Sequence, residues 1–297
     1  MKNDKTLFTV YTTVHNEEEY IAECICSVLN QSYDNFEFLI INDGSTDNTH
    51  DEIKKFLHDE RITYINKKKL GKVAAINNLW QSMRGDWGYF MGGDDRMPDN
   101  ALELWHRHTK SLDSNKMIAL CGEMITISED PKYNGLKLPK NKTRRNWSGP
   151  LALLSSGAIS AIGDLPECLP NEDTYWGIWL ETFAEEKVKI NEVIINYRFH
   201  SGNAISRGQD FSTFNKSYGV RMTAFSKFKK AFDKDLSNKQ KRMLDQKIEI
   251  EKFRSDGRWV NILFAKGPFV HKIRNILFSN KHFYKIKMLL DTYLIGW

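Results

Sequence analysis

The sequence is short of cysteine and of long apolar runs, and each shortage excludes a class of protein. Its four cysteines have neither the C-x-x-C spacing of zinc and redox sites nor the pattern of a secreted disulfide framework; they are Cys24, Cys26, Cys121 and Cys168. No stretch approaches the ~18 apolar residues that a membrane-spanning helix needs, and the first residues lack the charged-then-apolar order of a signal peptide. We therefore expect a soluble, cytoplasmic protein with reduced, structural cysteines.

The net charge is also small. The chain carries +5 over 297 residues, which is too little for a protein dedicated to nucleic acid, so we expect no nucleic-acid partner. Lysine and arginine nevertheless gather after residue 226, and this asymmetry needs a separate explanation. The length allows a sizeable core, either as one large domain or as a compact domain with an appendage.

The first hundred residues alternate β-rich runs with amphipathic stretches, which is the pattern of βαβ units around a mostly parallel sheet. Strands are predicted at residues 8–14, 36–41, 62–65 and 87–91, and helices at 18–29, 47–57 and 72–83. The run at 36–41 is almost entirely apolar, as expected for a strand that is buried on both faces. Polar motifs follow the strands at their carboxyl ends, where ligands bind in open α/β sheets.

The rest of the chain predicts one more αβ section and then a helical region. We expect a helix at 98–112, a strand at 117–127, a helix at 171–186, a last strand at 188–199 and helices from residue 211 onward. A Lys-, Asn- and Pro-rich stretch at 130–147 predicts a long loop. Such a loop could bind the acceptor or act as a lid, or it could simply be disordered. These elements predict an α/β domain over 1–208 and a helical, basic extension over 209–297.

Two adjacent acids, Asp94 and Asp95, follow the strand at 87–91. Adjacent carboxylates repel in a dry pocket, so such a pair is stable mainly when a cation neutralises it, and hard oxygen ligands suit Mg²⁺ or Mn²⁺ together with substrate phosphates. Gly92 and Gly93 let the backbone approach a ligand closely. The alternative is a solvated acidic turn before Pro98.

Three further polar features each have a functional and a structural interpretation. Asp43 follows the buried strand in I-I-N-D-G-S-T-D and can accept an N–H of a planar base, or cap the next helix. Glu172 and Asp173 open a helix whose tryptophans can raise the pKa of a general base, or the two acids can simply complement the helix dipole. His200, after the last strand, can bind a metal or a phosphate, or lie at the surface.

Together, these motifs closely resemble those of family 2 glycosyltransferases with the GT-A fold, over about residues 6–207. The family's opening is matched by T-V-Y-T-T-V-H-N-E-E-E-Y-I and by L-N-Q-S-Y-D-N-F-E-F-L-I-I-N-D-G-S-T-D-N-T, and its G-K-x-x-A-x-N segment by L-G-K-V-A-A-I-N-N. The set is completed by N-E-D-T-Y-W-G-I-W-L and Y-R-F-H-S-G-N-A-I-S. Several ordered motifs that agree at once are more specific than a single short pattern.

The resemblance implies an α/β GT-A nucleotide-binding fold and an inverting transfer from a nucleotide-sugar donor, with no covalent nucleophile. Thr13, His15 and Asp43 would hold the base, which we expect to be uracil, while Lys72 would lie near the diphosphate or the ribose. Asp94 would contact the ribose. The expected partners are the nucleotide-sugar donor and a glycan or lipid-linked acceptor, in bacterial-type surface-glycan synthesis.

The same resemblance implies a metal and a general base. Asp95 would bind Mn²⁺ or Mg²⁺, which bridges the diphosphate and stabilises the leaving group, and His200 would complete the metal or diphosphate shell. Asp173 would be the catalytic base, with Glu172 orienting it or the acceptor. Gly92 stands where the family often has a further Asp, which implies weaker metal binding.

The C-terminal part adds a membrane hypothesis. Residues 259–297 mix aromatic and aliphatic side chains with Lys, Arg and His, which suits an anionic membrane surface holding a lipid-linked acceptor, and equally a helical subdomain packed on a catalytic core. No Q-x-x-R-W motif follows His200, which argues against a processive polysaccharide synthase. The sequence leaves homo-oligomerisation open.

Two other functions are alternatives. A nucleotidyltransferase that makes a nucleotide-sugar would open with a glycine-rich, arginine-bearing phosphate loop, and none is visible near residues 10–16. A non-catalytic basic protein that binds membrane or nucleic acid would have no need of Asp43, Asp95 and Asp173 together. We therefore favour a metal-dependent glycosyltransferase.

Overall fold

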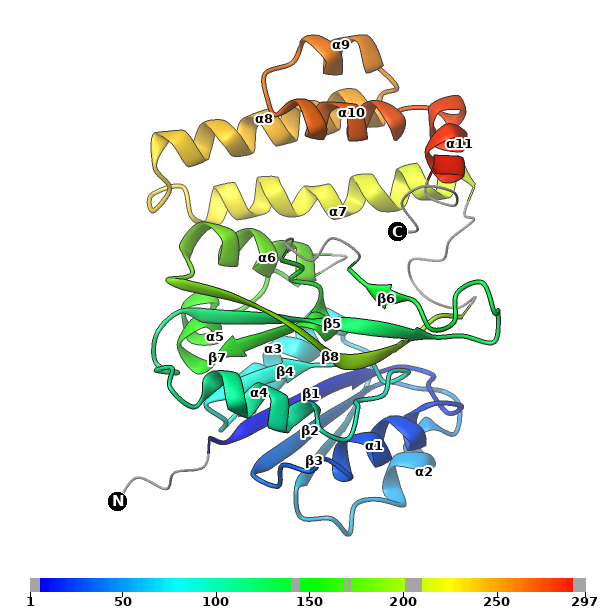
Figure 1. Cartoon of the computed structure of the whole chain (residues 1–297), viewed down its shortest axis with the longest axis vertical. Helices are drawn as coiled ribbons and strands as arrows, with labels where there is room; N and C mark the ends of the chain where they lie inside the picture. The colour runs from blue at the N-terminus through cyan, green and yellow to red at the C-terminus, as the bar shows by residue number, and fades with distance from the viewer. Residues whose placement is uncertain (1–5, 140–144, 168, 170–171, 201–209, 291–297) are drawn as a thin grey trace. The chain divides into compact units, whose positions relative to one another are not determined.

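The computed structural model describes residues 6–139, 145–167, 169, 172–200 and 210–290 (Figure 1). The chain divides into two compact units. The first combines Met1–Cys168 with Trp179–Ser201, and the second combines Leu169–Ile178 with Gly202–Trp297. The second unit thus includes residues 169–178, which the sequence-based division placed in the α/β domain; the functional division at residue 208 stays a proposal.

Among the described residues, an eight-stranded sheet forms the framework of the first unit. Its strands are β1 (Phe8–Val14), β2 (Phe36–Asp43), β3 (Ile62–Lys67), β4 (Trp87–Phe90), β5 (Ile118–Ile127), β6 (Lys137–Leu138), β7 (Ala152–Ser155) and β8 (Glu186–Arg198). The order is β3-β2-β1-β4-β7-β5-β6, and β8 pairs with β5. The first four strands are parallel and so are β5 and β8, whereas β6 and β7 run antiparallel to their neighbours. The predicted mostly parallel sheet is confirmed.

Helices cover both faces of this sheet (Figure 1). They are α1 (Ile21–Leu29), α2 (Thr49–Lys54), α3 (Lys72–Ser82), α4 (Ala101–Thr109) and α5 (Ser156–Ile162), while α6 (Glu172–Phe183) contributes to both units. Side chains of α1, α2 and α4 join the main core. On the other face, Trp80 of α3 donates its Nε1–H to the Tyr11 hydroxyl at 2.9 Å. Both faces of the central strands are therefore covered, which explains the nearly continuous apolar run of β2.

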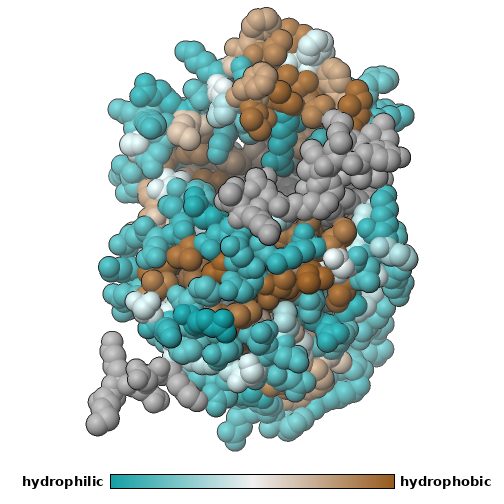
Figure 2. Space-filling view, viewed as in Figure 1, coloured by the Kyte–Doolittle hydropathy of each residue, from teal (hydrophilic) through white to brown (hydrophobic). Residues whose placement is uncertain are grey.

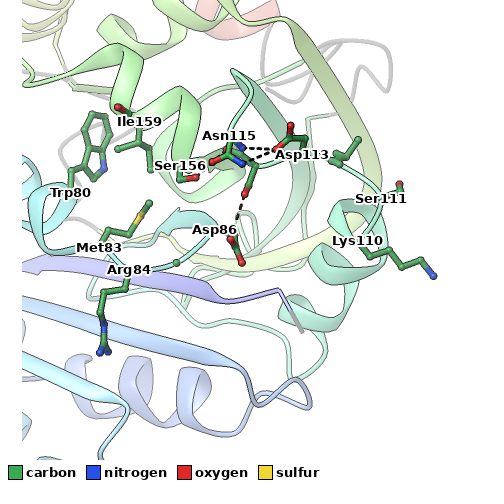
Figure 3. Close-up of a pocket in the computed structure, with 14 residues that line it drawn as sticks. Trp80, Met83, Arg84, Asp86, Lys110, Ser111, Asp113, Asn115, Ser156 and Ile159 are labelled. Atoms are coloured by element: carbon green, nitrogen blue, oxygen red, sulfur yellow. Dashed lines mark hydrogen bonds between the residues drawn. The ribbon is translucent and has the colours of Figure 1, made fainter. Parts of the chain in front are cut away.

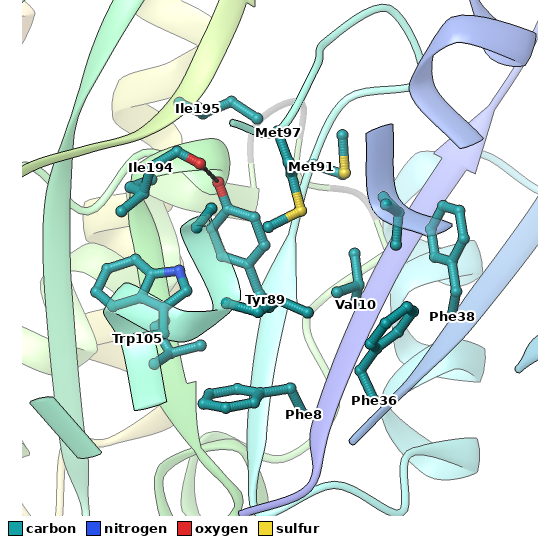
Figure 4. Close-up of a cluster of buried hydrophobic side chains, with 14 of the residues drawn as sticks. Phe8, Val10, Phe36, Phe38, Tyr89, Met91, Met97, Trp105, Ile194 and Ile195 are labelled. Carbon is teal, nitrogen blue, oxygen red and sulfur yellow. Dashed lines mark hydrogen bonds between the residues drawn. The ribbon is translucent and has the colours of Figure 1, made fainter. Parts of the chain in front are cut away.

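The main core lies between the sheet and the helices α1, α2 and α4, and Figure 4 shows part of it. Trp105 of α4 is fully buried, and its ring lies 6.0 Å from the ring of Tyr89 in β4. The Tyr89 hydroxyl donates to the Pro150 carbonyl at 2.7 Å, so the polar end of the ring is also satisfied. This packing holds β4 in place, and β4 is the strand that leads into the acidic turn.

Most predicted elements are confirmed, with boundaries that shift by a few residues. The helices predicted at 18–29, 47–57 and 98–112 are shorter at one or both ends. The stretch at 148–163 received no predicted element but contains β7 and α5, because a four-residue strand shows no clear hydrophobic period. The loop predicted at 130–147 contains β6, and residues 140–144 of it lie outside the described part of the chain.

The cysteines are free where the structure describes them. Cys24 and Cys121 are buried, whereas Cys26 is exposed. Cys24 and Cys26 therefore point to different faces of α1, as predicted. Cys168 lies outside the described residues.

The second unit is helical, as predicted from residue 211 onward. After α6 it contains α7 (Phe211–Ala231), α8 (Asn238–Ser255), α9 (Trp259–Phe264), α10 (Phe269–Leu277) and α11 (Lys281–Leu290). Asp210 caps α7 through the backbone N–H groups of the first turn, and Ser237 forms a capping box at the start of α8. Along the part of the chain that the structure describes, no helix combines the length and apolarity needed to cross a bilayer.

A buried ion pair lies within α8, and its arginine also contacts neighbouring helices. The fully buried Arg254 of α8 donates two hydrogen bonds to Glu251, at 2.7 and 2.6 Å, and a third to the Phe278 carbonyl at 3.2 Å. Its guanidinium also lies 4.7 Å from the centre of the Tyr218 ring in α7. Through these contacts Arg254 fixes the segment after α10 against α7 and α8. Removing one partner of a buried ion pair typically destabilises a protein by about 3–5 kcal/mol.

Candidate active site

The acidic turn follows β4 at the carboxyl edge of the sheet, where Asp95 is almost completely buried. It is 1% exposed, and its two carboxylate oxygens accept the backbone N–H groups of Arg198 at 2.9 Å and Gly92 at 3.3 Å. Burial and the neighbouring Asp94 carboxylate raise the pKa of Asp95 well above its usual range. Asp95 therefore ties the turn after β4 to the end of β8, at the cost of burying a carboxyl group.

Asp94 has a different environment. Its side chain is 17% exposed, and its Oδ2 lies 3.1 Å from His200 Nε2. The backbone carbonyl of Asp94 accepts a hydrogen bond from Arg198 Nε at 2.8 Å, so the turn is fixed to β8 a second time. Fixing the turn in this way sets a carboxylate oxygen and an imidazole nitrogen side by side at a partly open position.

Gly92 makes room for both carboxylates. A Cβ atom at this position would lie 2.5 Å from Asp94 Oδ1 and 2.9 Å from Asp95 Oδ2, closer than ordinary contacts allow. The two acids thus converge over the bare Gly92 backbone. At the position where the family often has a further Asp, a larger side chain would require one of the two carboxylates to move.

Replacing Gly92 by alanine should force one carboxylate to move. Because displacements of about 1 Å at a site can cost roughly 100-fold, we expect Gly92→Ala to weaken Mn²⁺-dependent binding of a nucleoside diphosphate by about 10- to 100-fold in calorimetry. Gly219→Ala in α7 is the matched control, since a Cβ there has no neighbour closer than 3.7 Å. Unchanged binding by the Gly92 variant would show that the convergence of the carboxylates is unimportant.

The predicted base-binding residues gather at the same edge of the sheet. Thr13 is the penultimate residue of β1 and pairs with Ile41 of β2, and Asp43 ends β2. The Asp43 carboxylate accepts backbone N–H groups of Leu70 at 2.6 Å and Gly71 at 2.9 Å. Asp43 is therefore engaged in closing the loop before α3, and its binding of a base stays a proposal.

His15, just after β1, and Lys72, at the start of α3, flank this edge. His15 Nε2 is 2.8 Å from the Lys69 ammonium. Its buried Nδ1 has no hydrogen-bond partner within the described residues. Lys72 is the first residue of α3, and its ammonium lies 5.0 Å from the centre of the Phe90 ring. The structure thus brings the predicted cationic and polar groups to the carboxyl ends of β1, β2 and β4.

Glu17 is a residue that the sequence analysis missed. Burial, with the charges of Asp94 and Asp47, raises its pKa to about 7. A carboxyl group that titrates near neutrality beside the acidic turn is a functional-site candidate on physical grounds. Glu17 was present in the motif H-N-E-E-E-Y, but three consecutive glutamates gave no reason to single out the first one.

Glu172 and Asp173 occupy the first turn of α6, as predicted. Glu172 is 3% exposed, whereas Asp173 is partly exposed and lies near the Thr174 hydroxyl, at 3.4 Å. Both acids belong to the second unit, while Asp94, Asp95 and His200 belong to the first. Their membership of one active site is therefore a proposal.

A cavity of about 750 Å³ opens at the opposite edge of the sheet (Figure 3). It is lined by residues that precede β4, such as Arg84 and Asp86, and by Ser156 and Ile159 of α5. This edge holds the amino ends of the parallel strands, whereas ligands of open α/β sheets bind at the carboxyl ends. The cavity is therefore separate from the acidic turn.

Comparison with known proteins identifies the family. The model of the family described as glycosyl transferase family 2 matches residues 9–162, slightly more than half of the chain. The chain belongs to glycosyl transferase family 2. The resemblance seen in the sequence motifs is confirmed, and family membership favours a transferase over the nucleotidyltransferase and the non-catalytic alternatives.

The chain matches only part of the length of its relatives. An uncharacterized glycosyltransferase of Rickettsia conorii is 28% identical over 237 residues, which are 74% of this chain and 38% of the relative. Glycosyltransferase GlyA of Streptococcus pneumoniae is 35% identical over 100 residues, 33% of this chain and 14% of GlyA. The chain thus spans well under half the length of these two relatives.

Solved structures confirm the GT-A type fold. S. aureus TarS in complex with UDP-GlcNAc superposes with a TM-score of 0.63 at 15% identity, covering 96% of this chain and 89% of that one. The mannosyltransferase PcManGT from Pyrobaculum calidifontis, in complex with GDP-Man and Mn²⁺, gives 0.59 at 14% identity, covering 96% and 87%. At these identities the likeness concerns the fold alone.

Proposed function

We propose that this family 2 protein is an inverting, metal-dependent glycosyltransferase. It takes a sugar from a nucleoside-diphosphate donor, which we assign as a UDP-sugar, and transfers it to a hydroxyl of a glycan or lipid-linked acceptor in surface-glycan synthesis. The observation that carries the proposal is the Asp94–His200 pair at 3.1 Å, set at the carboxyl edge of a GT-A sheet. The UDP-GlcNAc complex of TarS supports the choice of UDP.

The donor atoms at the acidic turn fit a divalent metal, with one change of role. Asp95 is 1% exposed and its oxygens accept two backbone N–H groups, so we assign it to holding the turn. Asp94 and His200 would hold the ion. Among the described residues, no group of three or more His, Cys, Asp or Glu side chains is arranged to hold a metal ion, so the remaining ligands would come from the diphosphate and water.

The proposed metal is Mn²⁺ rather than Mg²⁺. Mg²⁺ takes oxygen ligands almost exclusively, whereas an imidazole nitrogen such as His200 Nε2 is better suited to a transition metal. The bound ion would neutralise the charge that develops on the departing diphosphate. The Mn²⁺ complex of PcManGT supports this choice.

The remaining residues bind and position the substrates. Thr13, His15 and Asp43 would face the base at the ends of β1 and β2, and Lys72 would place its ammonium near the phosphates. Asp173 would accept the proton of the acceptor hydroxyl as it attacks, with Glu172 beside it. One base and one in-line displacement are sufficient for an inverting transfer, so no covalent intermediate is required.

A screen of donors tests the proposed function. We expect the intact protein to hydrolyse UDP-sugars slowly with Mn²⁺ present, because water replaces the acceptor, and to do so less with GDP- or ADP-sugars. Release of the nucleoside diphosphate is measured with and without a chelator. If no nucleotide-sugar is turned over or bound in the presence of Mn²⁺, the proposal is wrong. Once the screen has identified a preferred donor, the acceptor is sought by adding lipid extracts or glycans to the reaction with that donor.

We also propose that the enzyme works in the cytoplasm at the inner face of the cell membrane, where a lipid-linked acceptor would be accessible. The support is the basic and apolar composition of the C-terminal helices.

A further inference from the structure

The helices α9 and α10 form a hairpin whose outer side chains are unusually apolar. Trp259, Val260, Leu263 and Phe264 of α9 are 41–80% exposed, and Phe269, Val270 and Ile273 of α10 are 42–79% exposed. Figure 2 shows hydrophobic surface gathered at the end of the helical unit where α9 lies in Figure 1. Such a concentration is unusual, because exposed apolar residues on soluble proteins are normally scattered.

The hairpin is held in a defined shape from within. Ile262 of α9 is fully buried and Asn275 of α10 is 1% exposed, so each helix has an inner and an outer side. The Lys272 ammonium donates to the carbonyls of Leu263 at 2.9 Å and Ala265 at 3.1 Å, which ties the start of α10 to the end of α9. Phe264 and Phe269 are therefore presented by ordered helix ends rather than by a disordered tail.

Charge identifies what this apolar surface can dock against. Residues 257–290 contain seven Lys and Arg and no Asp or Glu. Five of these cations are exposed; they are Arg258, Lys266, Arg274, Lys281 and Lys285. An apolar face on a segment that carries cations and no acidic residue matches an anionic lipid surface, whereas a second copy of the same hairpin would bring like charges together.

We propose that the hairpin of α9 and α10 is a membrane-docking element that inserts Phe264, Phe269 and Val270 into the headgroup region of an anionic bilayer. Exposed aromatic and aliphatic side chains supply the apolar contact, and the surrounding lysines and arginines attract the acidic headgroups. Docking of this kind is reversible and keeps the protein peripheral. The proposal deepens the membrane location proposed above, and it is independent of the catalytic assignment because it rests on the hairpin.

Vesicle binding of the intact chain tests the proposal. Vesicles of phosphatidylcholine with phosphatidylglycerol are expected to retain the protein at low salt, and vesicles of phosphatidylcholine alone much less. Replacing two exposed aromatics together, Phe264→Ser with Phe269→Ser, should weaken binding roughly 100-fold, since burying each ring is worth about one decade or more. Met243→Ser is the matched control, because Met243 is 49% exposed on α8 of the same unit; it should bind as the unmodified protein does.

A charge variant separates electrostatic attraction from apolar insertion. Lys266→Gln with Arg274→Gln, at two exposed cations of the hairpin, should weaken binding to the anionic vesicles by roughly 25-fold and reduce its dependence on salt. Failure of the unmodified protein to bind anionic vesicles, or equal binding by the aromatic double variant, would overturn the proposal. So would light scattering that shows a dimer which the aromatic replacements dissociate.

Measuring nucleotide-sugar hydrolysis by the same variants distinguishes a failure of the docking proposal from a failure of the proposed catalytic function. Phe264→Ser with Phe269→Ser should leave donor hydrolysis in solution unchanged, because neither ring belongs to the acidic turn or to the base-binding loops. Loss of vesicle binding with intact hydrolysis is the expected result. Loss of hydrolysis in this variant would contradict the assignment of the hairpin to docking alone.

Discussion

Asp94→Ala is expected to lower Mn²⁺-dependent donor turnover by at least about 100-fold, the size of effect seen when one group that stabilises a developing charge is removed. The partly exposed Asp94 side chain lies 3.1 Å from His200 Nε2 and is the accessible carboxylate of the pair. Its replacement relieves the repulsion from Asp95, so the melting temperature should not fall. Turnover and nucleoside-diphosphate affinity are measured over a range of Mn²⁺ concentrations.

Asp95→Ala is the contrasting variant. It leaves the buried backbone N–H groups of Gly92 and Arg198 without their acceptor, at a cost of about 1–3 kcal/mol for each unsatisfied group, partly offset because a buried carboxyl group is also removed. Its main expected effect is therefore a lower melting temperature. If Asp95→Ala kept its stability and lost Mn²⁺ dependence while Asp94→Ala kept both, the roles of the two acids would be reversed.

The contrast between the two acids shows where sequence reasoning was sufficient. The motif and its place after a buried strand predicted an acidic turn at the carboxyl edge of the sheet, and β4 ends as expected. Assigning unequal roles to the two carboxylates depends on burial, and burial follows from β8, which is about a hundred residues away in the sequence. No local pattern carries that information.

The same limit applies to Asp43 and Glu17. The sequence placed Asp43 correctly at the end of β2, but its contacts with Leu70 and Gly71 arise from the loop after β3. The pKa of Glu17 is raised by burial and by Asp94 and Asp47, two charges from separate loops. Positions relative to strand ends are thus predictable from hydrophobic period and turn residues, whereas electrostatic environments require the assembled sheet edge.

The hairpin of α9 and α10 shows the reverse case. Its composition left two outcomes open, membrane contact or burial within a helical subdomain packed on the catalytic core. The structure buries Ile262 and leaves Phe264 and Phe269 outside, so part of the apolar surface is used in packing and part is not. The periodicity of a short helix cannot divide its apolar residues between these uses, because both sides of α9 are apolar.

Asp173→Asn is expected to retain donor binding and lose transfer, with a fall in kcat of about 10²- to 10⁴-fold, which is the usual contribution of a general base. The amide has nearly the same shape as the carboxylate but cannot take the proton of the acceptor hydroxyl. Donor affinity is measured by calorimetry with Mn²⁺, and transfer by product formation with the acceptor found in the screen. Asp164→Asn, an exposed acid of the first unit, is the matched control and should transfer normally.

This variant also decides between the two interpretations of the first turn of α6. If Asp173 only complemented the helix dipole, its loss would cost about 0.3–1 kcal/mol of stability and leave kcat unchanged. If it is the base, kcat falls while the melting temperature stays within a few degrees of the unmodified protein. Glu172→Gln should raise KM for the acceptor more than it lowers kcat, because we assign Glu172 to positioning. Full turnover by Asp173→Asn would remove this residue from the mechanism and leave Glu17, whose pKa is raised to about 7, as the carboxyl group best suited to accept a proton near neutral pH.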